Sequence, residues 1–324
     1  MRRSLPAFSL MEVMVALGIS LAIMSAASVS TIAIYRQFNE TTARVRIDAE
    51  AKVLGEYIVS YFRQSGGDVV RPWMSTRIVN STTGSDQFVG AEYNENFPSC
   101  PIVDVNTAGT TVEFQTDGGG TCCYNATVQD RQIMLVDKRS RRWILRHISA
   151  IDTVGCTATV AAGLTGVLDN PPTTPPDFID GTGVIVDVAR IRHDEMENNL
   201  VVDTDPDTDN VFNTRIVAPD IYGLQFSIGF DFDPVDGMLR DDASGSDEWL
   251  YNSVGDTEDP LAPVPVGAGR QDLRLVGVGF ISGWTTARTT NTAKVFDGPT
   301  LSQSKVQLRV HRSTAYFRND FTFQ

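Results

Sequence analysis

The sequence predicts an α+β protein in which a long N-terminal helix packs on an antiparallel β-sheet domain. Three observations predict this fold class. Residues 13–34 form an uncharged run, residues 45–62 place apolar side chains every three or four positions, and short alternating apolar runs follow from residue 68 onward. With 324 residues, of which 42% are hydrophobic, the chain is long enough for one large β domain and a helical extension.

The uncharged run has the length of a membrane span. A helix over residues 13–34 extends roughly 33 Å, which is enough to cross the hydrocarbon core of a bilayer. Arg2 and Arg3 precede the run and favour a cytoplasmic N-terminus. A secretory signal peptide has a shorter apolar region that ends at a small-residue cleavage site, whereas here the helical pattern continues past residue 35. We therefore predict a single-pass membrane helix.

An acidic residue, Glu12, stands at the start of this apolar segment. A helix that only anchors a protein in the membrane does not require a carboxylate at this position. Removing a carboxylate from water is costly unless a partner compensates its charge. Glu12 is therefore a predicted functional site.

Residues 7–12, Ala-Phe-Ser-Leu-Met-Glu, resemble the processing motif of type IV prepilins. The resemblance implies that residues 1–7 are a leader, that prepilin peptidase cleaves between Ala7 and Phe8, and that the new amino terminus of Phe8 is methylated. Glu12 would then pair with the charged terminus of a neighbouring subunit, which offsets its desolvation. The family usually has glycine where this chain has Ala7. Because alanine is closest to glycine in size, we still expect cleavage, at a slower rate.

The helix is predicted to continue through residues 35–66 as an amphipathic segment. The apolar positions of its stripe are Val45, Ala49, Val53, Leu54, Tyr57, Ile58, Tyr61 and Phe62. No proline interrupts residues 8–65, and Gly66 with Gly67 supplies a stop signal. We expect residues 8–34 to lie in the membrane or in a fibre core, and residues 35–66 to pack on the distal domain.

Residues 67–324 are predicted to form that domain, which is rich in β-strands. The expected strands are 111–115, 132–137, 142–148, 183–190, 224–232, 273–280 and 305–311. Residues 170–176, 203–210 and 233–270 are expected to be loops. After residue 65 the chain holds 20 Lys and Arg against 35 Asp and Glu, which disfavours nucleic-acid binding and keeps an exported domain soluble.

Four cysteines, Cys100, Cys122, Cys123 and Cys156, allow two disulfide bonds in an exported domain. A bond between the adjacent Cys122 and Cys123 would be strained. We therefore expect one of them to join Cys100 and the other Cys156, with the pairing left open. The absence of a C-x-x-C spacing argues against a zinc ribbon and against thioredoxin-like chemistry.

Two acidic turns are weak candidates for a calcium site, and no other cofactor is predicted. The first has carboxylates at every second position, Asp203, Asp205, Asp207 and Asp209, and the second contains Asp231, Asp233 and Asp236. The first departs from the EF-hand pattern at its sixth and twelfth positions, where Thr208 and Thr214 stand. A solvated acidic loop is the favoured interpretation. The chain has no nucleophile elbow, P-loop or zinc-protease motif, so we do not expect an enzyme.

Short stretches further resemble the PilW-type minor pilins: residues 55–66, residues 221–226 with the acidic turn 231–237, and residues 316–319. The resemblance implies a minor pilin of a type IVa pilus in the inner membrane, which helps to prime assembly at or near the tip and supports twitching motility. Its implied partners are other minor pilins, the major pilin, the platform protein and prepilin peptidase. The alternatives are a minor pseudopilin of a type II secretion system, an adhesive tip subunit and a signal-anchored periplasmic enzyme.

Overall fold

The computed structural model describes residues 10–64, 76–106, 109–116, 119–137, 142–162, 178, 181–205, 211–230, 249–250, 273–285 and 291–316. The chain divides into two compact units, Met1–Glu50 and Ala51–Gln324. A long apolar helix near the N-terminus and a large antiparallel β domain are both present, as predicted from the sequence.

The single long helix α1 (Leu10–Gln64) runs through both units. Its 55 residues correspond to roughly 80 Å of helix. The segment contains no proline, and its most frequent residue is alanine, which favours helix. The predicted start of the helix at residue 8 lies outside the described residues.

The distal unit is built from β-strands. They are β1 (Thr76–Val79), β2 (Gln87–Tyr93), β3 (Cys100–Val105), β4 (Thr111–Phe114), β5 (Gln132–Asp137), β6 (Arg142–Asp152), β7 (Thr157–Ala162), β8 (Thr182–Asp194), β9 (Asn199–Thr204), β10 (Asn213–Ala218), β11 (Ile221–Phe230), β12 (Trp249–Leu250), β13 (Leu273–Thr285), β14 (Asn291–Ala293), β15 (Leu301–Gln303) and β16 (Val306–Tyr316), with a short 3-10 helix, η1 (Ala126–Val128), before β5. Every predicted strand overlaps one of these.

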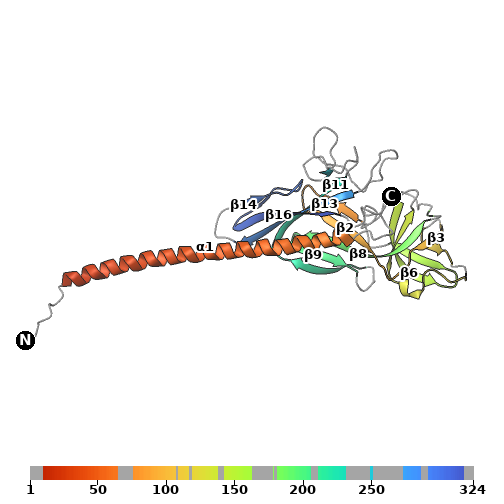
Figure 1. Ribbon diagram of the computed structural model, residues 1–324, viewed down its shortest axis with the longest axis horizontal. Coiled ribbons are helices and arrows are strands. Elements are labelled where there is room, and N and C mark those ends of the chain that lie inside the picture. The colour runs from red at the N-terminus through yellow and green to blue at the C-terminus, as the bar shows by residue number, and fades with distance from the viewer. Residues whose placement is uncertain are drawn as a thin grey trace, which may run out of the picture. The chain divides into compact units, whose positions relative to one another are not determined.

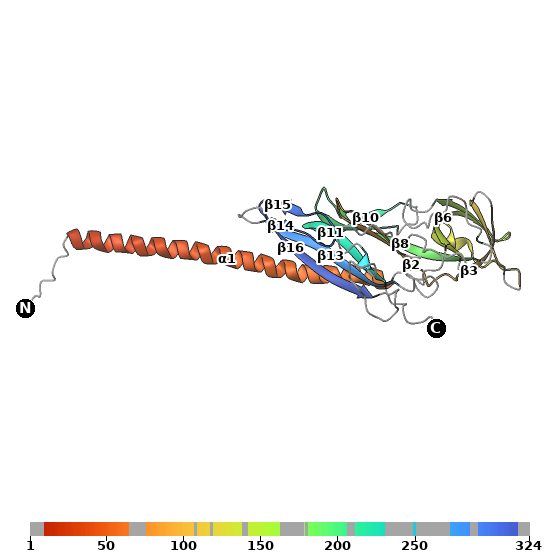
Figure 2. The same ribbon diagram turned by 90° about the horizontal axis from the view of Figure 1, so that it is seen from above.

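Part of the largest sheet closes on itself. The strands β3, β4, β7, β6, β5 and β8 pair antiparallel in this order, and β8 also pairs with β3. These pairings form a closed ring of six strands, so the sheet leaves no free edge there. Figures 1 and 2 show these strands at the end of the domain away from the last turns of α1.

The interior of this ring is a separate hydrophobic core. Its members are Cys100, Ile102, Val112, Phe114, Tyr124, Val128, Ile133, Leu135, Ile144, Ile148, Ala158, Val160, Phe178 and Ile185. Gly183 of β8 lies so close to this core that a Cβ atom there would be 2.8 Å from the Phe114 ring. The buried Tyr124 hydroxyl donates to the Gly183 carbonyl at 2.7 Å. Glycine at position 183 thus leaves space for aromatic side chains inside the six-stranded ring.

The long strand β8 joins the ring to the part of the domain that contains the helix. Its first residues pair with β3 and β5, whereas Val186 to Arg192 pair with β2 and the last residues pair with β9. A second sheet has the antiparallel order β12-β11-β13-β16, and β14 and β15 form a separate hairpin. Among the described residues, the domain therefore has two large sheets and a hairpin, a division that the sequence had left open.

The end of α1 packs on strands of both large sheets within the distal unit. The helix contributes Ala51, Leu54, Ile58, Val59 and Phe62 to a core that also contains Phe88, Ile191, Leu200 and Val202 from one sheet and Leu224, Phe226, Val278 and Phe280 from the other. Figures 1 and 2 show the last turns of α1 beside β13 and β16. This core anchors the helix to the domain.

Two loop predictions are wrong in part, because the short strand β12 (Trp249–Leu250) lies within residues 233–270 and strand β9 reaches into residues 203–210. Residues 203–210 were expected to form an acidic loop, but Asp203 and Thr204 are the last residues of strand β9. Their predecessors Leu200, Val201 and Val202 are buried, and the strand pairs with β8 and β10 on its two sides. The continuous apolar run before Asp203, which is typical of a strand buried on both faces, therefore extends the strand further than the run of acidic residues suggests.

Candidate functional site

The first half of α1 exposes apolar side chains on every side. Large hydrophobic residues more than 50% exposed include Leu10, Met11, Met14, Val15, Leu17, Ile19, Leu21, Ile23, Met24, Val29, Ile32 and Ile34. A helix of a soluble protein normally confines such residues to one stripe, and that stripe is buried against the core. By length and composition, the helix from Leu10 to Arg63 is suited to cross a membrane, and no residue of its most apolar window is buried.

The hydroxyl groups of this segment are hydrogen-bonded within the helix. Each donates to a backbone carbonyl three or four residues earlier, at 2.8–2.9 Å: Ser20, Ser25, Ser28, Ser30 and Thr31. In lipid or in a packed fibre, a polar group has no water to bond, so an internal partner is needed. The segment is thus suited to a water-poor environment.

Glu12 lies in the first turn of α1 and is the only charged residue between positions 10 and 34. A carboxylate is favoured there because the backbone N–H groups at a helix N-terminus carry partial positive charge. The predicted cleavage and methylation positions, Ala7 and Phe8, lie outside the described residues. The geometry between the Phe8 amine and Glu12 therefore stays a prediction.

The last turns of α1 are fastened by aromatic contacts. The ring of Phe62 is fully buried, with its centroid 4.0 Å from that of Phe88 and 5.7 Å from that of Phe226. On the helix surface, the Tyr57 and Tyr61 hydroxyls lie 3.1 Å apart, and Arg215 donates to the Tyr57 oxygen. Burial, together with the hydrogen bond to Tyr57, raises the pKa of Tyr61 to about 12. The Tyr61 hydroxyl therefore stays protonated at neutral pH.

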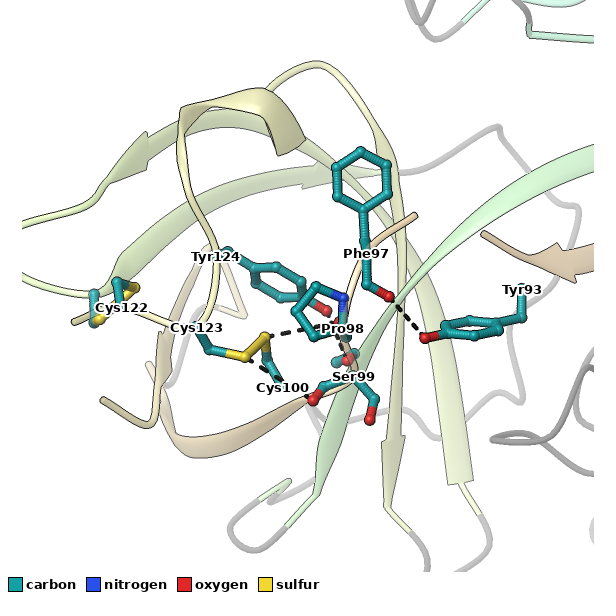
Figure 3. The surroundings of a disulfide bond; sticks show 10 residues. Tyr93, Phe97, Pro98, Ser99, Cys100, Cys122, Cys123 and Tyr124 are labelled. Atoms are coloured by element: carbon teal, nitrogen blue, oxygen red, sulfur yellow. Dashed lines mark hydrogen bonds between the residues drawn. A yellow bond between two sulfur atoms is a disulfide. The ribbon is translucent and has the colours of Figure 1, made fainter. Parts of the chain in front are cut away.

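Two disulfide bonds link the vicinal cysteines to different strands. Cys123 bonds to Cys100 at the start of β3, and Cys122 bonds to Cys156 in the turn before β7, with Cα–Cα distances of 5.9 and 5.2 Å. Figure 3 shows the Cys122 side chain pointing away from that of Cys123. The loop that carries both residues is thus bound at two points to the wall of the six-stranded ring.

The predicted acidic calcium site is not assembled by the described residues. The Asp203 carboxylate is fully buried and accepts hydrogen bonds from Arg190 and Arg192 at 2.8 Å and from the Thr214 hydroxyl at 2.6 Å. Burial raises its pKa, but these bonds outweigh burial and lower the pKa below its usual value. Asp203 is therefore a neutralised structural anion that joins β8, β9 and β10.

The remaining members of that acidic run differ from Asp203. Asp205 accepts a hydrogen bond from the Gln132 side chain at 3.2 Å, whereas Asp207 and Asp209 lie outside the described residues, as do Asp231, Asp233 and Asp236. Within the described part of the chain, no group of three or more His, Cys, Asp or Glu side chains is arranged to hold a metal. The sequence analysis missed this geometry because the register of the β8–β9 pair, which places Arg190 and Arg192 beside Asp203, does not follow from the acidic run itself.

No protein-family model, curated protein or solved structure that was compared with the chain matches it.

Proposed function

We propose that this chain is a minor pilin of a type IVa pilus, held in the inner membrane before assembly and located at or near the pilus tip afterwards. The exposed apolar surface of residues 10–34, with the single acidic residue Glu12 at its start, supports this proposal. Such a surface is unfavourable in water and is covered by lipid before assembly and by other helices in a fibre.

Each part of the helix has a role in this function. Prepilin peptidase removes residues 1–7, and the new Phe8 amine of one subunit pairs with Glu12 of its neighbour. Other minor pilins and the major pilin cover the apolar surface, and the platform protein transfers subunits out of the bilayer. The large distal unit, residues 51–324, is compatible with a position where few copies lie close together.

Mass spectrometry of the mature protein is the direct test. The proposal expects an N-terminal methylated Phe8, and an intact Met1 or a cleavage beyond the apolar segment would contradict it. Deletion of the gene separates this proposal from a type II secretion pseudopilin. Loss of pili and twitching motility supports the minor pilin, whereas loss of protein secretion with normal pili supports the pseudopilin.

A further inference from the structure

A cavity in the distal unit plays no part in the proposed assembly. Its volume is about 200 Å³, and its lining comes from the connection between β1 and β2, the end of β8 with the turn that follows it, and strands β11, β13 and β15. Pockets for drug-sized ligands measure about 300–1,000 Å³. This cavity therefore suits a smaller ligand, of the size of a single ring.

Hydrogen bonds between distant segments hold the polar wall of the cavity in place. The Ser85 hydroxyl lies 2.8 Å from His193 Nδ1 and accepts the Leu224 backbone N–H at 3.1 Å. The Ser85 backbone N–H donates to a Glu195 carboxylate oxygen at 3.2 Å. The β1–β2 connection is thus joined to both β8 and β11, so the wall is formed before a ligand enters, which reduces the entropic cost of binding.

The rest of the lining is largely apolar. Ile281 and Val295 are buried, and Tyr222 and Leu301 are half-buried beside them. The Tyr222 ring lies against the backbone of β13, where a Cβ atom added to Gly283 would be 2.6 Å from its Cε2 atom. An aromatic ring and aliphatic side chains provide a surface on which the C–H groups of a ligand can pack.

The polar groups of the lining are suited to recognise hydroxyl groups. Among the lining residues that the structure describes, none is a lysine or an arginine, and Glu195 supplies the one carboxylate. Burial lowers the pKa of His193, so its ring is neutral at neutral pH. The amides of Asn198, Gln225 and Gln303 both donate and accept hydrogen bonds, as a hydroxyl does. This lining therefore favours a neutral ligand over an anion.

One of these amides has an unused acceptor. Gln225 is 2% exposed, and its nitrogen donates to the Gly84 carbonyl at 2.7 Å. Its oxygen is buried and accepts no hydrogen bond from the described part of the chain. Because a buried amide oxygen normally has a donor, a hydroxyl group or a water held in the cavity is the missing partner.

We propose that this cavity binds one neutral sugar ring of a glycan. A pyranose ring carries C–H groups on its faces and hydroxyl groups around its edge. Tyr222 and Leu301 would contact the C–H groups, and Glu195 and Gln303 would bond to the hydroxyl groups. In a subunit at a pilus tip, a location that rests on the proposed function, the site would attach the fibre to a glycan-bearing surface.

Saturation-transfer NMR of the purified full-length protein, in a detergent without a sugar headgroup, tests the binding. The probes are glucose, galactose, mannose, N-acetylglucosamine and N-acetylgalactosamine, each used alone. We expect at least one of them to bind with a Kd on the order of 1 mM, because a single ring makes few contacts. Binding of none of the five overturns the proposal. Tighter binding of glucosamine, which is a cation, than of every neutral sugar also overturns it.

This measurement is independent of the proposed function. It uses the isolated protein, whereas the role in a pilus is tested by the mature N-terminus and by piliation. A methylated Phe8 without sugar binding would therefore contradict only the sugar site. Sugar binding by a protein with an unprocessed N-terminus would contradict only the role in a pilus.

Two neighbouring exposed threonines provide a matched pair of variants that test the location. Thr83 lines the cavity and Thr82 does not. Thr83→Trp should fill the cavity entrance and abolish sugar binding, whereas Thr82→Trp should bind like the wild type, and both should keep the wild-type Tm. Sugar binding that is unchanged in Thr83→Trp, or lost equally in both variants, would overturn the proposal.

A second pair of variants tests the hydrogen bonds to the sugar. Gln303 lines the cavity, whereas Ser302, the preceding residue of β15, is exposed and lies on the other face of the strand. We expect Gln303→Ala to raise the Kd about fivefold, as for the loss of one hydrogen bond, and Ser302→Ala to leave it unchanged. Equal sugar affinity of the two variants would overturn the assignment of Gln303 to the site.

Discussion

The two ends of α1 have opposite relations to their surroundings. Residues 10–34 are apolar on all sides and exposed, whereas residues 51–64 bury one stripe and expose the opposite face. Phe62 is fully buried in the distal unit, and Val53, on the same helix, is 69% exposed. The apolar side chains of the first segment are therefore not covered by the described part of the chain, whereas those of the second segment pack within the distal unit.

The largest effect is expected at the outer end, from Glu12→Ala. If Glu12 pairs with a neighbour's amine, its loss leaves a buried positive charge unpaired, at a cost of about 3–5 kcal/mol. Immunoblots of sheared pili should then show little or none of the variant. The thermal stability of the distal unit should be unchanged. Normal incorporation of the variant would show that Glu12 is not an assembly residue.

At the inner end, Phe62→Ala should reduce the free energy of unfolding by about 3–5 kcal/mol, because it leaves a cavity beside Phe88 and Phe226. Denaturant unfolding followed by circular dichroism measures this loss. A change below about 1 kcal/mol would mean that the helix end is not anchored by this core.

A charge in the middle of the outer segment should impair membrane insertion and leave the stability of the distal unit unchanged. Leu21→Asp costs about 3–4 kcal/mol at the centre of a bilayer. We expect less protein in the membrane fraction and an unaltered denaturation midpoint for the distal unit. Full insertion of this variant would contradict a transmembrane position for Leu21.

A smaller loss is expected from Tyr57→Phe. It removes the hydroxyl that contacts Tyr61 and Arg215, and one such hydrogen bond is worth about 1 kcal/mol. A thermal melt compared with the wild type is the measurement. A loss as large as that of Phe62→Ala would indicate that the tyrosine pair, rather than the buried stripe, anchors the helix.

The smallest effect is expected from Val53→Ala, the control for Phe62 on the same helix. The side chain is mostly exposed and alanine favours helix, so stability should change by less than about 0.5 kcal/mol. A large loss measured in the same unfolding assay would mean that this face of the helix is covered.

The sequence predicts the helix more completely than the strands. Seven strands were located by alternating apolar residues, but short ones such as β14 and β15 have only three residues and give too few alternations to detect. The amphipathic stripe was predicted to include Val45, Ala49 and Val53, and all three are exposed. A spacing of three or four residues does not fix the edges of an apolar stripe. The sheet that packs against the helix determines which of the edge residues are buried.

The candidate sites also differ in how well the sequence predicts them. The motif at residues 7–12 is contiguous, so its chemistry can be inferred from residue types alone. The acidic run beginning at Asp203 is also contiguous, yet its first member is neutralised by Arg190 and Arg192 across a strand pair. The cavity beside β11 was not predicted, because no local pattern connects residues so far apart in the chain.

By itself, the sequence determined the long N-terminal helix, its apolar first half, the position of Glu12 and the presence of a β domain. These depend on the composition and order of neighbouring residues, which set helix propensity and membrane affinity. The tertiary structure decided the closed six-stranded ring, the pairing of Cys122 with Cys156, and the neutralisation of Asp203. These depend on register and contacts between distant strands, and many pairings of such strands satisfy the same local pattern.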